Sequence, residues 1–170
     1  KHLLDASDKL MESLYPAESN HLVDMKELLM QDNFFIGAFI REKLVGCAAM
    51  IVKKEELNYG EIKRLFVDEN YRGQKIAMKL MQALEDQALN QNYQWIRLET
   101  GIHQQPSIHL YEKLGYQKTK PFGNYVEDPF SVFMEKKTAS TDLAASVFDI
   151  PMLVAIFPIR SSLFIKTCLP

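Results

Sequence analysis

The residues best suited to chemistry lie in the loop 71–77, which reads Tyr-Arg-Gly-Gln-Lys-Ile-Ala. The loop follows a run of β-branched and aromatic residues and opens into a segment whose apolar residues recur at helical spacing. The first N–H groups of a helix have no acceptor within it, and they point outward with the positive end of the helix dipole. The sequence therefore predicts a phosphate or pyrophosphate site at residues 72–77.

The elements that position this loop follow from hydrophobic spacing and turn residues. Helices are predicted at residues 4–14, about 20–30, 76–90 and 105–114. Strands are predicted at residues 34–40, 44–52, 59–67, 94–100, 116–118 and 131–135. The first three strands form a meander, and the long helix carries the chain across the sheet. The pattern indicates an α+β fold with a mixed, mostly antiparallel sheet, flanking helices and one central crossover.

Composition limits the partners that the protein can have. The 170 residues are 47% hydrophobic, which suits one domain with a sizeable core. Lys and Arg number 20 against 22 Asp and Glu, so there is no basic surplus and we expect no nucleic-acid partner. We see no signal peptide, and residues 150–159 are too short an apolar run to span a membrane, so we expect no membrane partner.

Cysteine and histidine usage argues against disulfides and metals. Cys47 and Cys168 lie in no CxxC pattern, and the apolar surroundings of Cys47 predict a buried free thiol. A reducing cytoplasm is therefore the expected compartment. The four histidines show no metal-ligand spacing, and we expect no metal: they are His2, His21, His103 and His109.

The chain changes character after residue 136. Residues 136–142 are linker-like, and residues 147–169 are apolar but interrupted by Pro151 and Pro158. We expect a domain at residues 1–136 and an apolar C-terminal extension at residues 137–170. The extension would pack on the domain or on a neighbouring subunit, which leaves a homodimer open. The alternative is an incidental tail.

Two motifs resemble signatures of the GNAT N-acetyltransferase superfamily. The loop resembles the family's acyl-CoA-binding motif, Gln/Arg-x-x-Gly-x-Gly/Ala, with Arg72 first and Ala77 last, but Lys75 replaces the usual middle glycine. Residues 108–116 read Ile-His-Leu-Tyr-Glu-Lys-Leu-Gly-Tyr and resemble the second signature, Leu-Tyr-Glu-Lys-x-Gly-Phe/Tyr. The resemblance covers residues 1–136 and implies a GNAT fold.

A closer likeness is to a branch of small bacterial acetyltransferases. The shared segments are Tyr-Pro-Ala-Glu-Ser at 15–19, Gly-Glu-Ile-Lys-Arg at 60–64, Leu-Glu-Thr-Gly at 98–101 and Pro-Phe-Gly-x-Tyr at 121–125. In the family a strand precedes the first helix, whereas this chain begins almost at the helix. Either that strand is lost from the front or the apolar tail supplies a substitute.

The resemblance implies transfer of an acetyl group from acetyl-CoA to a primary amine of a small molecule by direct attack. The amides from Arg72 to Ala77 would hold the pyrophosphate, and the pantetheine arm would lie along Leu65 to Val67. Lys75 either blocks close backbone approach or adds a charge that favours phosphate. The alternative function is a non-catalytic acyl-CoA-binding module. The implied cofactor-binding residues are Leu65, Phe66, Val67, Arg72, Gly73, Gln74, Lys75, Ile76 and Ala77.

The resemblance also implies catalytic roles. Tyr111 matches the tyrosine that protonates the leaving thiolate, although a packing role is the alternative. Glu61 matches the strand glutamate that acts as base in the histone-acetylating branch, and Glu99 on the neighbouring strand competes for that role. Both carboxylates could instead form ion pairs, or a water chain could remove the proton. The candidates for substrate contact are Tyr15, Glu18, Ser19, His103 and Tyr125.

Overall fold

A computed structural model describes residues 2–21, 23, 25–28, 30, 32–53, 58–138 and 152–157. The helices are α1 (His2–Leu14), α2 (Met25–Leu28), α3 (Ile76–Asn90) and α4 (Gln105–Lys113). The strands are β1 (Phe34–Ile40), β2 (Lys43–Lys53), β3 (Tyr59–Val67), β4 (Trp95–Gly101), β5 (Gln117–Lys118), β6 (Ser131–Lys137) and β7 (Met152–Phe157).

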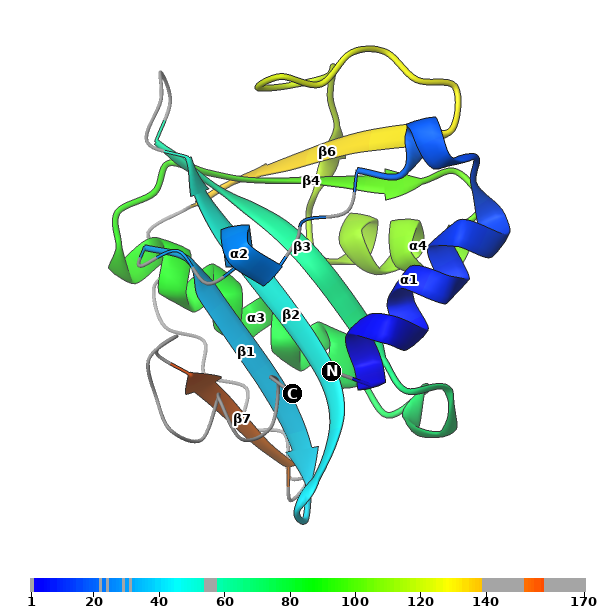
Figure 1. The fold of residues 1–170 in the computed structure, drawn as a ribbon. Helices are drawn as coiled ribbons and strands as arrows, with labels where there is room; N and C mark the ends of the chain where they lie inside the picture. Colours follow the sequence, from blue (N-terminus) through cyan, green and yellow to red (C-terminus); the bar gives the residue numbers. More distant parts are fainter. Residues whose placement is uncertain are drawn as a thin grey trace.

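The described strands form one seven-stranded sheet in the order β5-β6-β4-β3-β2-β1-β7 (Figure 1). Strands β1, β2 and β3 pair antiparallel as a meander. Strands β3 and β4 pair in parallel, and α3 is the crossover between them. The remaining neighbours are antiparallel. The predicted α+β fold with a mostly antiparallel sheet and one central crossover is confirmed.

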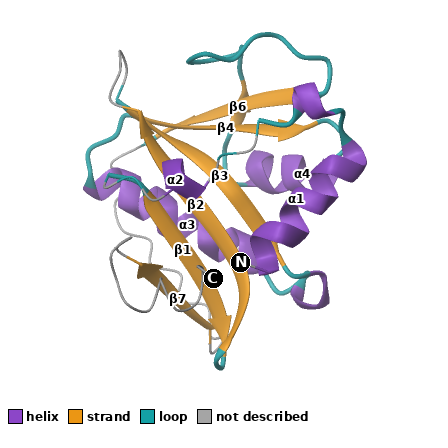
Figure 2. Cartoon of the chain, viewed as in Figure 1, coloured by secondary structure: helices purple, strands orange, loops and turns teal. Residues whose placement is uncertain are grey.

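Helices cover both faces of the sheet (Figure 2). On one face, Leu3 and Leu4 of α1 and Leu28 of α2 pack with apolar residues of β1 and β2. On the other face, the apolar side of α3, including Leu80 and Leu84, packs with the larger core. Because β2 lies between these two layers, eight of its eleven residues are buried on both of its sides. This explains why its sequence is a continuous apolar run rather than an alternating one.

Two predictions differ from the structure. Of the described residues in the predicted helix at about 20–30, those at Met25–Leu28 are helical. The chain before these residues is held in a non-helical path because the carbonyl oxygens of His21 and Val23 accept hydrogen bonds from Lys63 and Arg64 of β3. The predicted strand at 116–118 is reduced to two residues of β5.

The tail contributes an edge strand. Strand β7 pairs antiparallel with β1, from Ile40 opposite Met152 to Phe35 opposite Phe157. It thus lies beside the first strand of the meander, and its role as a substitute for the family's first strand stays a prediction. The other residues of the expected extension, 139–151 and 158–170, lie outside the described residues, as does Cys168. Cys47 is buried, as predicted, and its Sγ donates to the Arg64 carbonyl at 3.6 Å.

In the described parts of the chain, no helix has the length and apolar character needed to cross a membrane.

Candidate active site

The central strands separate at the site. The parallel pairing of β3 with β4 runs from Tyr59 and Trp95 to Ile62 and Leu98 and then stops. Beyond that point β3 continues beside β2, and β4 continues beside β6. Two cavities lie along the separated part of β3, and both include Leu65 and Phe66 in their walls.

Arg64 marks the bend that separates β3 from β4. Its φ of 57° is left-handed, which is unusual for a residue other than glycine, and the β2–β3 register shifts at this position. The guanidinium contacts the Asp8 carboxylate of α1, and Nε donates to the Val23 carbonyl at 3.1 Å. The bulged residue therefore also fixes α1 and the following connection over the site.

The larger cavity, which we call the loop cavity, has a volume of about 560 Å³ and lies between β3, the loop 71–77 and α4. Eight of the nine predicted cofactor-binding residues line it, and the exposed Gln74 does not. Those eight are Leu65, Phe66, Val67, Arg72, Gly73, Lys75, Ile76 and Ala77. Outward backbone N–H groups at the start of α3, beside two cationic side chains, suit a pyrophosphate.

Lys75 caps α3 in an unusual conformation. Its φ of 59° and ψ of 17° are left-handed, and Gly73 two residues earlier also has positive φ, at 77°. A glycine at position 75 would adopt this conformation without the steric cost that a side chain adds. The conformation explains why the family pattern has a glycine here, and this chain holds the same turn with a lysine.

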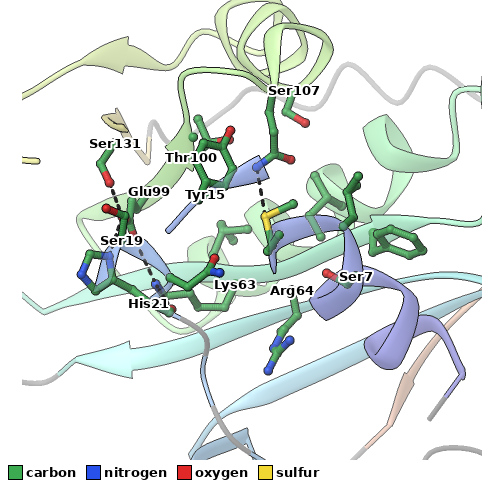
Figure 3. A pocket seen from close by; sticks show the side chains of 18 of the residues that line it. Ser7, Tyr15, Ser19, His21, Lys63, Arg64, Glu99, Thr100, Ser107 and Ser131 are labelled. Atoms are coloured by element: carbon green, nitrogen blue, oxygen red, sulfur yellow. Dashed lines mark hydrogen bonds and ion pairs between the residues drawn. The ribbon is translucent and has the colours of Figure 1, made fainter. Parts of the chain in front are cut away.

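The smaller cavity, which we call the polar cavity, has a volume of about 120 Å³ and is lined by residues that include Lys63, Glu99 and Thr100 (Figure 3). Predicted residues in its wall are Tyr15, Ser19, Glu99 and Tyr111. The two cavities share five wall residues, which are Leu10, Leu65, Phe66, Gln104 and Ser107. The two cavities are therefore direct neighbours.

Glu99 is the centre of a hydrogen-bonded cluster in the polar cavity (Figure 3). Its Oε1 lies 2.8 Å from His21 Nδ1 and accepts a 2.6 Å hydrogen bond from the Ser131 hydroxyl. Its Oε2 lies 3.6 Å from Lys63 Nζ. Each carboxylate oxygen thus faces at least one donor.

Glu61 lies deeper, at 3% exposure, and outside the walls of both cavities. Its Oε1 accepts a 2.6 Å hydrogen bond from the Tyr125 hydroxyl and lies 3.1 Å from Lys63 Nζ. Burial, and then the adjacent Glu61 carboxylate, raise the pKa of Tyr125 well above its usual value, so the phenol stays protonated and donates. Lys63 therefore joins the two predicted base candidates into one network, while only Glu99 lines a cavity.

Tyr111 is buried in the wall of the polar cavity. It lies on α4 and makes an edge-to-face contact with Tyr116, with ring centroids 5.9 Å apart. Burial raises the pKa of Tyr111 above the ordinary phenol value of about 10, so its hydroxyl carries a proton at neutral pH. Both the packing role and the acid role considered from the sequence agree with this position.

The predicted substrate residues divide among the two cavities and the surface. The Tyr15 ring stacks on His103 at 5.6 Å, and its hydroxyl accepts the His103 backbone N–H at 3.1 Å. His103 lines the loop cavity, whereas Ser19 lines the polar cavity. Glu18 is exposed, and Tyr125 lies outside both cavity walls.

His21 was not among the residues that the sequence selected. Its partner Glu99 is 78 residues away, so no local spacing could reveal the pair. The only signal was its place two residues after the Tyr-Pro-Ala-Glu-Ser segment. Among the described residues, no group of three or more His, Cys, Asp or Glu side chains is placed to hold a metal ion.

Comparison with known proteins shows the family of the chain. Residues 3–116 match the model of the "Acetyltransferase (GNAT) family". The chain is 42% identical over 134 residues to the IAA acetyltransferase of Azospirillum brasilense, covering 79% of this chain and 87% of that protein. It is 33% identical over 129 residues to the uncharacterized N-acetyltransferase YsnE of Bacillus subtilis, covering 75% of this chain and 84% of that protein.

Among solved structures, one similar to this chain is a putative acyl-CoA N-acyltransferase from Klebsiella pneumoniae. The TM-score is 0.63 at 34% sequence identity, and the alignment covers 81% of this chain and 88% of the other. The fold and the loop at the start of α3 lead to the same family as these relatives. The chain belongs to the acetyltransferase (GNAT) family of acetyl-CoA-dependent N-acetyltransferases.

Proposed function

We propose that the protein acetylates a primary amine of a small molecule by direct attack of the amine on acetyl-CoA. The observation that carries this proposal is the meeting of the two cavities at Leu65 and Phe66. The loop cavity, of about 560 Å³, includes the cationic side chains of Arg72 and Lys75 and the start of α3, which would receive the pyrophosphate of acetyl-CoA. The polar cavity shares Leu65 and Phe66 with it, so an acceptor there would lie next to the thioester.

The size of the polar cavity supports a small acceptor. Its volume of about 120 Å³ is below the range of about 300–1,000 Å³ that sites for drug-sized ligands occupy. It can hold the amine end of a molecule and little more.

The charges around the polar cavity support a cationic acceptor. Both cations in its wall are paired, Lys63 with Glu61 and Glu99, and Arg64 with Asp8. Three carboxylates therefore face two cations, which leaves one negative charge in the cluster when His21 is neutral. An entering ammonium group would complement that charge.

Residues of the loop cavity would bind acetyl-CoA, and a residue of the polar cavity would transfer a proton. Arg72, Lys75 and the backbone at the start of α3 would bind the pyrophosphate, and the apolar residues of β3 would align the arm. When bound, acetyl-CoA supplies an activated acetyl carbon and a thiolate leaving group. The protonated Tyr111 hydroxyl would donate its proton to the departing sulfur.

A panel of amines tests the proposal through release of free thiol from acetyl-CoA. The panel should include amino acids, aryl and alkyl amines and aminoglycosides, with IAA added because the Azospirillum brasilense relative is named for it. Saturable thiol release with one class of small primary amine, and an N-acetylated product by mass spectrometry, is the expected result. Tight binding of acetyl-CoA without turnover of any acceptor would favour the non-catalytic module.

A further inference from the structure

We infer that His21, oriented by Glu99, is the group that accepts the proton of the acceptor ammonium. This inference rests on the proposed function and deepens it by naming the base. Figure 3 shows the His21 ring beside the Glu99 carboxylate at one side of the polar cavity.

The contact with Glu99 fixes which nitrogen of His21 can act. A carboxylate only accepts hydrogen bonds, so the hydrogen in the 2.8 Å contact belongs to Nδ1. In the neutral ring, Nε2 then carries the lone pair and can accept a proton. Glu99 also stabilises the imidazolium that forms, because its negative charge lies at hydrogen-bond distance.

The surroundings hold His21 in place while leaving it open to the cavity. Its side chain is 35% exposed, and its ring makes an edge-to-face contact with Tyr125 at 5.2 Å. Its backbone carbonyl accepts from Lys63 Nζ at 3.5 Å. The charged and titratable groups around it are Glu99 on β4, Lys63 and Glu61 on β3, and Tyr125 and Asp128 on the loop before β6.

The carboxylates are less well placed for this role. Glu61 lies outside both cavity walls and already accepts from Tyr125. Glu99 lines the cavity, but Oε1 faces two donors and Oε2 faces Lys63. A proton taken by either carboxylate would break a charge-assisted contact, whereas Nε2 of His21 makes none of the side-chain hydrogen bonds found among the described residues.

One turnover needs two proton transfers from nitrogen and one to sulfur. Nε2 of His21 takes one proton from the ammonium, and the neutral amine forms the new carbon–nitrogen bond as the carbon–sulfur bond of the thioester breaks. Tyr111 gives its proton to the sulfur and regains one from the new amide nitrogen. His21 then passes its proton to water. No oxidant, metal or covalent enzyme intermediate is needed.

The test compares His21→Gln, His21→Ala and Glu99→Gln with wild type, using an acceptor found in the amine panel. His109→Gln is the matched control, because His109 is exposed on α4 and outside both cavity walls. We expect His21→Gln to lower kcat/KM for the amine about 100-fold, a typical loss for a general base. The dissociation constant of acetyl-CoA, measured by calorimetry, should stay within about twofold, since His21 does not line the loop cavity.

Two further readouts separate proton transfer from a structural role. Added imidazole should restore part of the activity of His21→Ala and leave Glu61→Gln unaffected, because only the first variant lacks an imidazole. The ratio of wild-type to His21→Gln kcat/KM should rise with pH, because only a neutral imidazole can accept a proton. Taking the ratio cancels the titration of the amine itself.

The outcomes separate the two proposals. If wild type turns over no acceptor, the proposed function fails and the role of His21 fails with it. If wild type is active and His21→Gln keeps its rate and pH profile, His21 is not the base and the proposed function stands. Equal losses of acetyl-CoA affinity and activity in His21→Gln, with no imidazole rescue of His21→Ala, would likewise overturn the role and indicate a structural residue.

Discussion

The ring of Tyr15 lies directly against the backbone of Gly101. A Cβ at Gly101 would sit 2.1 Å from both Cζ and the hydroxyl oxygen of Tyr15, far inside contact distance. Tyr15 is the first residue after α1, and Gly101 is the last residue of β4. Their close approach therefore fixes the chain that follows α1 over the polar cavity. Glycine is required here by space, since its φ is not in the left-handed region.

We therefore expect Gly101→Ala to displace Tyr15 and disturb acceptor binding. Overpacking should cost about 1–3 kcal/mol of unfolding free energy. Misplacing a positioning residue by about 1 Å can reduce kcat/KM for the acceptor by up to about 100-fold. Gly60→Ala is the control, since its Cβ would meet Met50 Sδ at 2.4 Å, outside both cavity walls. An acceptor KM unchanged in Gly101→Ala would contradict this role of the contact.

Replacing Lys75 separates backbone strain from charge. Lys75→Gly should raise the unfolding free energy by about 1 kcal/mol, because glycine adopts the left-handed cap without steric cost. Lys75→Ala removes the charge but keeps the strained conformation, so it should be the less stable of the two. If the ammonium attracts the pyrophosphate, both variants should bind acetyl-CoA a few-fold more weakly and with less salt dependence. Tighter binding in both would show that the side chain obstructs the site.

Tyr111→Phe tests the acid at the leaving sulfur. We expect kcat to fall about 100-fold with little change in KM for either substrate. Because burial raises the Tyr111 pKa, the phenol stays protonated up to at least the ordinary value of about 10. The ratio of wild-type to variant kcat should therefore be flat between about pH 6 and 9. Tyr116→Phe is the control, since this buried neighbour lines neither cavity, and equal losses in the two variants would argue for packing alone.

Asp128 should make stability depend on acid pH. The Phe130 N–H donates to its Oδ1 at 2.7 Å, and this bond, followed by one with Ser19, lowers the carboxyl pKa below 3.8. A group whose pKa is lowered in the folded state stabilises it above the unfolded pKa and loses that effect as pH falls through the folded value. The urea midpoint of unfolding should therefore be higher for wild type than for Asp128→Asn at pH 7. The difference between the two midpoints should shrink below pH 3.8.

Neutralising the exposed neighbour Glu127 controls for the change in net charge. Its replacement by Gln should leave the midpoint nearly unchanged at both pH values. If the difference in urea midpoint between wild type and Asp128→Asn stays constant from pH 7 to pH 3, the Asp128 carboxylate does not cause the pH dependence.

Local sequence determined most helices and strands and the loop 71–77. Strands β1 and β3 and the long helix α3 begin and end close to the predicted residues, because apolar spacing and turn residues act over a few positions. The proposed phosphate contacts of loop 71–77 come from the backbone at a helix start, so neighbouring residues define them. The left-handed φ of Lys75 belongs to the same loop, but its value came only from the structure.

Tertiary structure decided which side chains meet in the polar cavity. The separation of β3 from β4 depends on the bulge at Arg64, and the arginine then fixes the connection that carries His21. His21 and Glu99 meet across 78 residues, and Lys63, on the same strand as Glu61, forms ion pairs with both Glu61 and Glu99. Such contacts depend on how distant elements pack, and no spacing within one segment encodes them. The sequence by itself therefore determined the family fold and the loop at the start of α3, while packing decided which residues line the polar cavity.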